Sequence, residues 1–312
     1  MIPLVITVGF LVAAVLIISL VCYRMAFYVP PRKNGQTQAM DLPHGKIYEP
    51  YWEKMANWTR QTRQMPCEKL CITSVDGLEL HGKYYEYAPG APIELMFHGY
   101  RGTAERDLSG GVQRCFRLGH SALIVDQRCC GKSQGRTITF GVYEHLDCIK
   151  WIELAVEKFG PEVKLLLTGI SMGAATVLMA AGKPLPPNVV GVLADCGYST
   201  PRDIIRKVIR DRKLPVAVSY PFVRLGGLIY GGFDVERYSA LEAMKTCTLP
   251  VLLFHGENDD FVPCQMSRQI YEACNSKKRL VTVPGAGHGM CCLLDPDGYV
   301  AAMEEFFSPE LQ

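Results

Sequence analysis

The stretch VKLLLTGISMGAATVLMAAG, residues 163–182, decides the fold. Its opening apolar run, residues 163–168, predicts a buried strand, and the small apolar residues 174–181 predict a helix. The pentapeptide GISMG, centred on Ser171, joins the two. A sharp turn from a buried strand into a helix presents its central serine at the carboxyl edge of an α/β sheet. The stretch therefore predicts an α/β fold with Ser171 as a nucleophile.

A second Gly-x-Ser-x-Gly pattern, GKSQG, is centred on Ser133 and has a different context. Residues 126–130 separate it from the nearest strand pattern, and the β-branched run TIT follows it where a helix would be needed. Its Gly-Lys-Ser would belong to a phosphate-binding loop only with a glycine five positions before Gly131, where Asp126 stands. We therefore expect Ser133 to be a loop residue, and we do not expect nucleotide hydrolysis.

Strand and helix patterns alternate on both sides of this stretch. Eight strands are expected, at residues 69–75, 78–87, 93–97, 122–125, 163–168, 189–194, 251–254 and 280–283. Helical patterns accompany the later strands, at residues 142–158, 174–181, 265–274 and 297–307. Because repeated strand-helix units form parallel sheets, we expect residues 67–312 to form a mostly parallel eight-stranded sheet with helices on both faces. Residues 24–66 are expected to be a linker with a peripheral helix at 47–64 that docks on the domain.

The connection between the sixth and seventh expected strands is far longer than an ordinary crossover loop. We expect a cap insertion there, at about residues 200–246. Its first part places Ile204, Ile205, Val208 and Ile209 on one helical face and basic side chains on the other. This helix is expected either to pack on the core or to lie as a lid near a membrane. The apolar run VAVSYPFVRLGGLIYGG that follows is expected to line the substrate pocket.

A serine nucleophile needs a histidine that accepts its proton and a carboxylate that orients the histidine. On this type of fold the acid follows a late strand and the histidine follows the last one. Asp259 and His288 stand after the seventh and eighth expected strands. Asp260 is an alternative displaced by one residue, and Asp195 would serve if the acid followed the sixth strand. We expect Ser171, Asp259 and His288 to form a catalytic triad.

The other histidines are expected to have structural roles. His98 and His255 each precede a glycine at a strand end, where a histidine commonly holds loops by hydrogen bonds. Four more lie in the linker, in or before strands, or in a helix: His44, His81, His120 and His145.

Attack by the serine creates an oxyanion, which preorganised N–H groups must stabilise. The backbone amide of Met172 directly follows the nucleophile, and that of Tyr100 lies in HGYRG after the third expected strand. Gly99 and Gly102 permit the sharp loop at this position. We expect the amides of Tyr100 and Met172 to form the oxyanion hole.

The first residues of the chain differ from the rest. Residues 2–23 carry no charge and reach the length of about 20 residues that crosses a membrane. A cleaved signal peptide is the alternative, but it would normally begin with basic residues and end at a small-x-small site, whereas this segment ends in SLVCYRM. Arg24, Arg32 and Lys33 follow the span, so the rest of the chain is expected on the cytoplasmic side.

Composition excludes several kinds of partner. A net charge of +2 provides no basic surface for nucleic acid. The 13 cysteines are odd in number and include two adjacent pairs, which is poor spacing for a disulfide framework and agrees with a reducing compartment. Cys67 and Cys71 lie near His81, but the sequence has no second Cys or His pair at zinc-ligand spacing. No metal and no cofactor are therefore expected.

The segments LMFHGYRG, VDQRCCGKSQG, TGISMGAATVL, FHGENDDFVP and VPGAGHG together resemble the α/β-hydrolase fold superfamily. The resemblance covers roughly residues 67–307. Within the superfamily the chain is similar to membrane-anchored, single-span hydrolases related to the serine aminopeptidase and lysophospholipase-like group. The resemblance implies that DQRCCGKS, which contains Ser133, is the family's structural Asp-x-Arg-x-x-Gly-x-Ser loop.

The resemblance implies a serine hydrolase, and the fold hosts esterases, thioesterases and peptidases alike. Peptidase members usually anchor a free amine on acidic side chains of the cap, whereas this cap is basic and apolar. The expected function is therefore the cleavage of small-molecule or lipid-like acyl esters or thioesters at a membrane. A serine peptidase on the same triad and a catalytically silent, membrane-tethered binding module are the alternatives.

Overall fold

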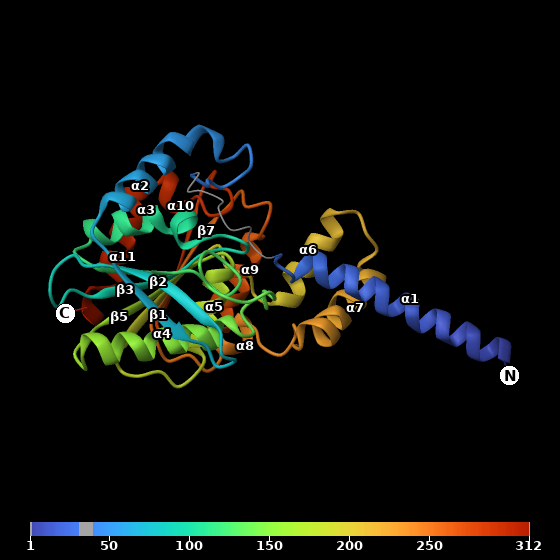
Figure 1. Cartoon of the computed structure of the whole chain (residues 1–312). Coiled ribbons are helices and arrows are strands. Elements are labelled where there is room, and N and C mark those ends of the chain that lie inside the picture. The colour runs from blue at the N-terminus through green and yellow to red at the C-terminus, as the bar shows by residue number, and fades with distance from the viewer. Residues whose placement is uncertain (1, 31–39, 312) are drawn as a thin grey trace.

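The computed structural model describes residues 2–30 and 40–311. At its centre is a sheet with the strand order β1-β2-β4-β3-β5-β6-β7-β8 (Figure 1). The strands are β1 (Glu68–Thr73), β2 (Glu79–Tyr85), β3 (Ile93–Phe97), β4 (Ser121–Val125), β5 (Leu165–Ile170), β6 (Val189–Asp195), β7 (Val251–Gly256) and β8 (Lys278–Val283). β2 pairs antiparallel with β1 and β4, and all other pairs are parallel. The prediction of a mostly parallel eight-stranded sheet is confirmed.

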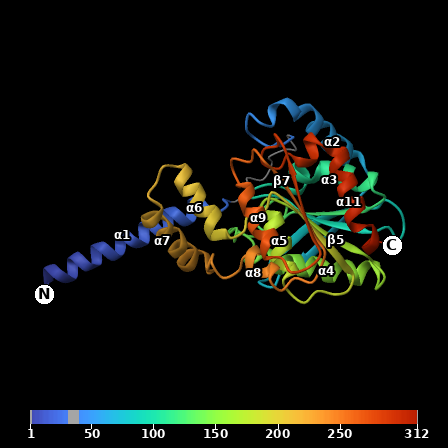
Figure 2. The ribbon, with the colours of Figure 1, turned by 180° about the vertical axis from the view of Figure 1, so that it is seen from behind.

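Helices cover both faces of this sheet (Figures 1 and 2). One face carries α4 (Glu144–Phe159), α5 (Met172–Ala181), α8 (Ala240–Met244) and α9 (Cys264–Ala273). The other face carries α3 (Ala104–Arg117), α10 (Cys291–Leu294) and α11 (Pro296–Leu311). The short η1 (Glu49–Tyr51) leads into α2 (Trp52–Gln64), which packs on the outside of α3. The core therefore lies in two layers, one on each side of the strands.

Helix α3 has no counterpart among the helices expected from the sequence. The Thr103 side chain begins it by accepting a hydrogen bond of 3.1 Å from the backbone N–H of Arg106. Its buried apolar residues recur at helical spacing: Ala104, Leu108, Val112 and Cys115. A glycine pair in the middle lowers helix propensity, which masks this pattern. A Cβ at Gly110 would lie 2.6 Å from the Trp58 ring, so this glycine lets α2 approach α3.

The long connection after β6 forms α6 (Pro201–Asp211), α7 (Val216–Gly226) and the π-helical turn η2 (Gly227–Gly231), which we call the cap. Ile204, Ile205 and Ile209 are buried, so the apolar face of α6 packs on the protein as the first of the two interpretations requires. Helix α7 packs along α1 (Ile2–Ala26), and both views show the cap on the side of the domain from which α1 leaves (Figures 1 and 2).

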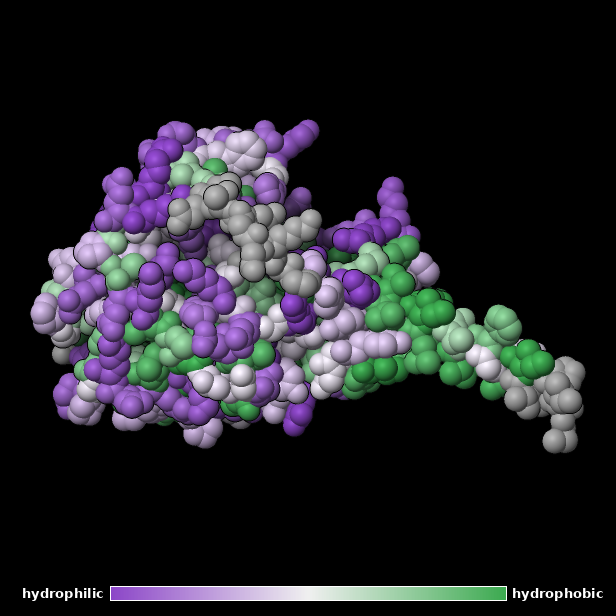
Figure 3. Space-filling view, viewed as in Figure 1, coloured by the Kyte–Doolittle hydropathy of each residue, from purple (hydrophilic) through white to green (hydrophobic). Residues whose placement is uncertain are grey.

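Helix α1 is the one helix in the described part of the chain that is long and apolar enough to cross a membrane. Its first half projects from the domain and exposes Phe10 and Leu11, and the projecting helix has a largely hydrophobic surface (Figure 3). Its last turn is part of the fold, because Tyr23 is buried, as is Phe27 just beyond it.

Of the basic residues expected to follow the span, Arg24 is exposed in the last turn of α1. Arg32 and Lys33 lie outside the described residues. The ring of Phe27 meets that of Phe233 edge-on at 5.1 Å, which joins the end of α1 to the segment after the cap.

Candidate active site

Ser171 lies at the turn between β5 and α5. Its backbone has a φ of 56°, a strained conformation for a residue with a side chain. The glycines on either side permit the turn: a Cβ at Gly169 would lie 2.2 Å from the Gly173 carbonyl oxygen, and a Cβ at Gly173 would lie 2.1 Å from that of Phe97. The local sequence thus forces the Ser171 side chain up at the carboxyl edge of the sheet.

His288 connects Ser171 to a carboxylate. Its Nε2 lies 2.9 Å from Ser171 Oγ, and its Nδ1 lies 2.7 Å from Oδ2 of Asp259. An ionised carboxylate accepts hydrogen bonds but donates none, so Nδ1 carries the proton and Nε2 is left to accept from the serine hydroxyl. The structure thus brings the three residues of the expected triad together in one hydrogen-bonded chain.

Asp259 is held in its ionised form. Its Oδ1 accepts from the backbone N–H groups of Phe261, at 2.9 Å, and Val262, at 2.8 Å. Burial favours the protonated carboxyl, but hydrogen bonds from His255 and His288 outweigh burial and hold the pKa of Asp259 below its usual range. A carboxylate that remains ionised can stabilise a positively charged His288.

The two alternative acids have other environments. Asp195, at the end of β6, is buried, and burial raises the pKa of its carboxyl to about 6. Asp260 is exposed beside Asp259. The carboxylate hydrogen-bonded to the Nδ1 of His288 is that of Asp259.

Two further histidines near the site hold loops, as predicted. Nε2 of His98 accepts from the backbone N–H of Gln127 at 3.0 Å, so its Nδ1 donates to the Gly99 carbonyl at 2.7 Å. His255 places Nδ1 2.6 Å from Ser267 Oγ and Nε2 2.8 Å from the Val262 carbonyl. Burial lowers the pKa of His98, which keeps this ring neutral.

Ser133 is a loop residue, as predicted. Its hydroxyl donates to the Asp126 carbonyl at 2.6 Å and accepts from the backbone N–H of His81 at 2.9 Å. A Cβ at Gly131 would lie 1.8 Å from the Asp126 carboxyl, so this glycine allows the loop to fold over that side chain. The second pentapeptide therefore ties β2 to the loop after β4.

The expected oxyanion residues lie on either side of Ser171. Met172 is the first residue of α5, where helix geometry leaves N–H groups without intrahelical acceptors. Tyr100 lines the same cavity as Ser171. The side chains of this loop bind the end of α1: the Tyr100 hydroxyl donates to the Ala26 carbonyl at 2.7 Å, and Arg101 donates to that of Met25 at 3.1 Å. The sequence gives no signal for this contact, because its partners are more than seventy residues apart.

A cavity of about 250 Å³ opens beside Ser171 and His288. Much of its wall is apolar or aromatic: Pro43, Tyr48, Met55, Trp58, Met96, Leu108, Ile170, Leu193, Phe261, Leu293 and Tyr299. Among the described residues that line it, none comes from 200–246, so the expectation that the cap lines the pocket is wrong. Helix α7 packs on the apolar surface of α1 instead, and this side of the pocket is formed by Tyr48, α2 and α3.

The segment around η1 and α2 does more than cover the cavity. The Tyr48 hydroxyl donates to the His288 backbone carbonyl at 2.8 Å, and Lys54 Nζ donates to that of Leu293 at 3.3 Å. Trp58 lies in the cavity wall and against Gly110 of α3. This segment therefore positions the loop that carries His288.

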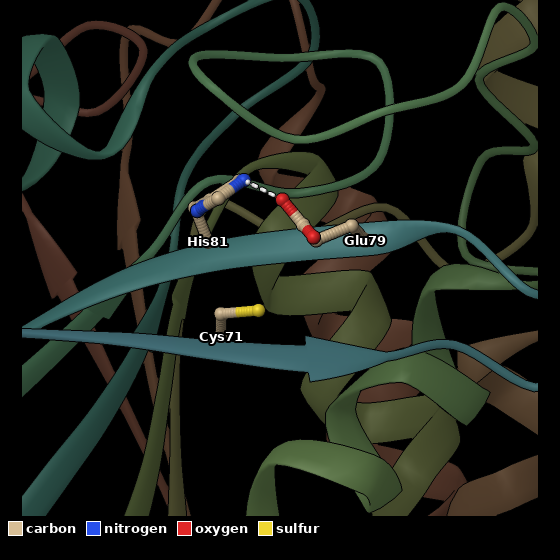
Figure 4. A group of neighbouring side chains, drawn as sticks. All are labelled: Cys71, Glu79 and His81. Carbon is tan, nitrogen blue, oxygen red and sulfur yellow. Dashed lines mark ion pairs between the residues drawn. The ribbon is translucent and has the colours of Figure 1, made fainter.

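Among the described residues, two groups of side chains have atoms close enough to hold a metal ion. Cys71, Glu79 and His81 lie on the neighbouring strands β1 and β2, where Glu79 and His81 form an ion pair of 2.9 Å (Figure 4). The second group, Cys196 with Asp259 and His288, overlaps the hydrogen-bonded chain described above.

Comparisons with known proteins agree with this fold. A model of the alpha/beta hydrolase family matches residues 95–302. The uncharacterized protein YqkD of Bacillus subtilis is 25% identical over 303 residues, which are 96% of this chain and 95% of YqkD. Protein bem46 of Schizosaccharomyces pombe is 26% identical over 222 residues, 70% of this chain and 67% of bem46. The structure of the Pyrococcus furiosus esterase Pf2001 has the same fold, with a TM-score of 0.68 and 19% sequence identity. The match covers 92% of this chain and 99% of the esterase chain.

Proposed function

The chain belongs to the alpha/beta hydrolase family, and on this premise we propose that it is a membrane-anchored serine hydrolase that cleaves acyl esters or thioesters. The observation that carries the proposal is the hydrogen-bonded chain from Ser171 through His288 to Asp259. Its order along the sequence and its strained serine turn are those of the family's catalytic machinery. A purely structural role would not require a serine held at a φ of 56° beside an open cavity.

The reaction would begin when Ser171 Oγ attacks the acyl carbonyl while Nε2 of His288 takes the hydroxyl proton. Asp259 would stabilise the resulting imidazolium, and the amides of Tyr100 and Met172 would bind the oxyanion. Collapse of the tetrahedral intermediate would break the ester or thioester bond, and His288 would protonate the leaving alcohol or thiol. Water, deprotonated by His288, would then hydrolyse the acyl-enzyme, release the acid and restore Ser171.

The wall of the cavity supports an acyl substrate. Apolar and aromatic side chains gain free energy by removing a hydrocarbon chain from water, roughly 0.8 kcal/mol for each buried CH₂ group. A cavity of about 250 Å³ suits an acyl group of short or medium length. The shared fold with the esterase Pf2001 agrees with this choice of substrate.

A peptidase activity on the same triad has less support. Such an enzyme needs a carboxylate free to bind a substrate amine. In the cavity wall, Asp107 pairs with Arg106 at 2.7 Å, and the buried Asp195 has a pKa of about 6. Asp107 is therefore already paired with a cation, and Asp195, although mostly ionised at neutral pH, is buried and carries a desolvation penalty.

Helix α1 supports an uncleaved anchor. Proteolytic removal of α1 after Ala26 would leave the hydroxyl of Tyr100 and the guanidinium of Arg101 without the carbonyls of Ala26 and Met25. It would also take Tyr23 out of a buried cluster that includes Phe27 and Phe233. Because Arg24 follows the span, we further propose that the catalytic domain faces the cytoplasm.

A fluorophosphonate probe, which reacts with activated serines, tests the proposal on the full chain. We expect labelling of the wild type and of Ser133→Ala, and loss of labelling in Ser171→Ala. Unlabelled wild-type protein would instead favour the silent binding module. A panel of p-nitrophenyl esters, acyl thioesters and aminoacyl amides then ranks the substrates, and preference for the amides would reject the ester assignment.

Topology needs its own experiment. Protease added to sealed inside-out vesicles should digest the catalytic domain if it faces the cytoplasm, and protease added to intact cells should leave it untouched. The reverse pattern would reject the cytoplasmic orientation without affecting the assignment of the active site.

A further inference from the structure

The cap contacts α1 well inside the apolar part of that helix. The Tyr230 hydroxyl of η2 donates to the Leu16 carbonyl at 2.9 Å, and the rings of Tyr230 and Tyr23 lie 6.0 Å apart. A Cβ at Gly226 would lie 2.5 Å from the Ser19 carbonyl oxygen, so α7 and α1 touch backbone to backbone there. η2 and the end of α7 are thus packed against the segment from Leu16 to Tyr23.

The position of this contact along α1 sets its depth in a membrane. An α-helix rises 1.5 Å per residue, so Leu16 lies about 10 Å along the axis from Tyr23. If residues 2–23 cross the hydrocarbon layer, the contact with Tyr230 lies about 10 Å inside the layer's edge. A bilayer around α1 therefore also surrounds η2.

The surface of the cap is suited to this position. Val218, Leu228 and Ile229 are 58%, 44% and 47% exposed, and Leu214 is exposed in the loop before α7. Hydrophobic surface runs without a break from α1 onto the neighbouring cap (Figure 3). A soluble domain rarely exposes a continuous apolar patch of this kind, because its contact with water is unfavourable.

Charged side chains in and beside the cap are either ion-paired or exposed. Arg224 forms ion pairs with Asp234 at 2.7 Å and Glu236 at 2.9 Å, which lowers the cost of bringing them near a membrane. α6 and the loop after it expose basic side chains that could contact anionic lipid: Arg202, Arg210, Arg212 and Lys213.

We propose that the cap is a second membrane-binding element, in which Leu228 and Ile229 lie among lipid acyl chains and the basic residues of α6 contact anionic head groups. The proposal rests on the membrane anchoring proposed for α1. Because Tyr100 and Arg101 bind the end of α1, a cap seated in the bilayer fixes the catalytic face next to the membrane surface.

The test uses the full chain in vesicles of phosphatidylcholine and phosphatidylglycerol with a phospholipid that carries a photoreactive diazirine on its acyl chain. After illumination, mass spectrometry of peptides locates the lipid adducts. We expect adducts on α1 and on residues 214–231, and none on Val75 or Tyr87, which are exposed elsewhere on the domain. Adducts on α1 alone would overturn the proposal for the cap, whereas adducts on neither would reject the anchor itself.

A variant sharpens this test. Leu228→Ser combined with Ile229→Ser should reduce adducts on residues 214–231 at least threefold while adducts on α1 remain. Val75→Ser, also at an exposed apolar residue, serves as the matched control and should change neither. Hydrolysis of a soluble ester in detergent should be unchanged in both, which shows that the proteins are folded. Unchanged cap adducts in the double variant would also contradict the proposal.

Discussion

Two regions of the molecule, the cap and the segment around α2, have the opposite roles to those that their sequences favour: the segment around α2 lines the pocket, and the cap does not. The segment before the first strand is polar, and its sequence predicts a peripheral helix, yet Tyr48, Met55 and Trp58 line the cavity beside Ser171. The cap is apolar and follows β6 like a lid, yet it packs on α1. The difference teaches that an apolar insertion goes to the largest available apolar surface, which in this chain is the helix proposed as its anchor and not the pocket.

The largest expected effect concerns the proposed catalytic residues and their exposed neighbour. Asp259→Asn should lower kcat about 10⁴-fold, because the amide cannot hold His288 in the tautomer that accepts from Ser171. Asp260→Asn alters an exposed neighbour, and its kcat should stay within about twofold of the wild-type value because this side chain lies outside the chain of hydrogen bonds. Steady-state hydrolysis of a p-nitrophenyl ester measures both. Equal losses in the two variants would contradict the assignment of Asp259.

Two glycines test the comparison directly. Gly110→Val forces the Trp58 ring away and should displace α2 from the pocket, with a loss of roughly 10- to 100-fold in kcat/KM. Gly226→Val pushes α7 away from Ser19 and should leave hydrolysis of a soluble ester within about threefold, because the cap does not line the cavity.

Limited proteolysis provides a second measurement on the two glycine variants. Limited proteolysis in detergent should cut the cap faster in Gly226→Val and the segment around α2 faster in Gly110→Val. If Gly226→Val were the more damaging variant for activity, the cap would have to act on the pocket after all.

Removal of two tyrosine hydroxyls, one beside the pocket and one in the cap, should have smaller and different effects on kcat. Tyr48→Phe removes the hydrogen bond to the His288 carbonyl and should cost about 1 kcal/mol in positioning, or about fivefold in kcat. Tyr230→Phe removes the bond to the Leu16 carbonyl and should leave kcat unchanged. Fluorophosphonate labelling rates provide an independent readout. A loss in Tyr230→Phe equal to that in Tyr48→Phe would show that the two regions are coupled.

Two aspartates should give pH effects of opposite sign. Burial raises the pKa of Asp195 to about 6, so its ionisation weakens the folded state as pH rises from about 4 through 6. Asp195→Asn should therefore have a higher free energy of unfolding than wild type at pH 7.5, by up to roughly 3 kcal/mol, and the difference should vanish near pH 4.

The segment after the cap provides the contrasting acid. The hydrogen bond from Arg224 lowers the pKa of Asp234, so its stabilising effect is present above pH 4 and lost as pH falls further. Asp234→Asn should destabilise the protein at pH 7.5 by only roughly 0.5 kcal/mol, because the pair is partly solvated. Thermal unfolding between pH 3 and 8 measures both variants, and a common sign would refute the comparison.

Much of the fold is readable locally. The eight strands and the turn at Ser171 follow from apolar runs and glycines that act within a few residues of one another. Helix α3 is missed because Gly110 and its neighbour weaken the helical pattern. A glycine is needed at position 110 because the Trp58 ring packs against it, and Trp58 is remote in sequence.

The sequence by itself determined the α/β sheet and singled out Ser171, Asp259 and His288, because strand-to-helix turns and motif order are encoded in short segments. Only the tertiary structure decided that the segment around α2 closes the pocket, that the cap packs on α1, and that Tyr100 binds the end of α1. These contacts join residues far apart in the chain, and their partners are chosen by the apolar surface that remains uncovered once the sheet has formed.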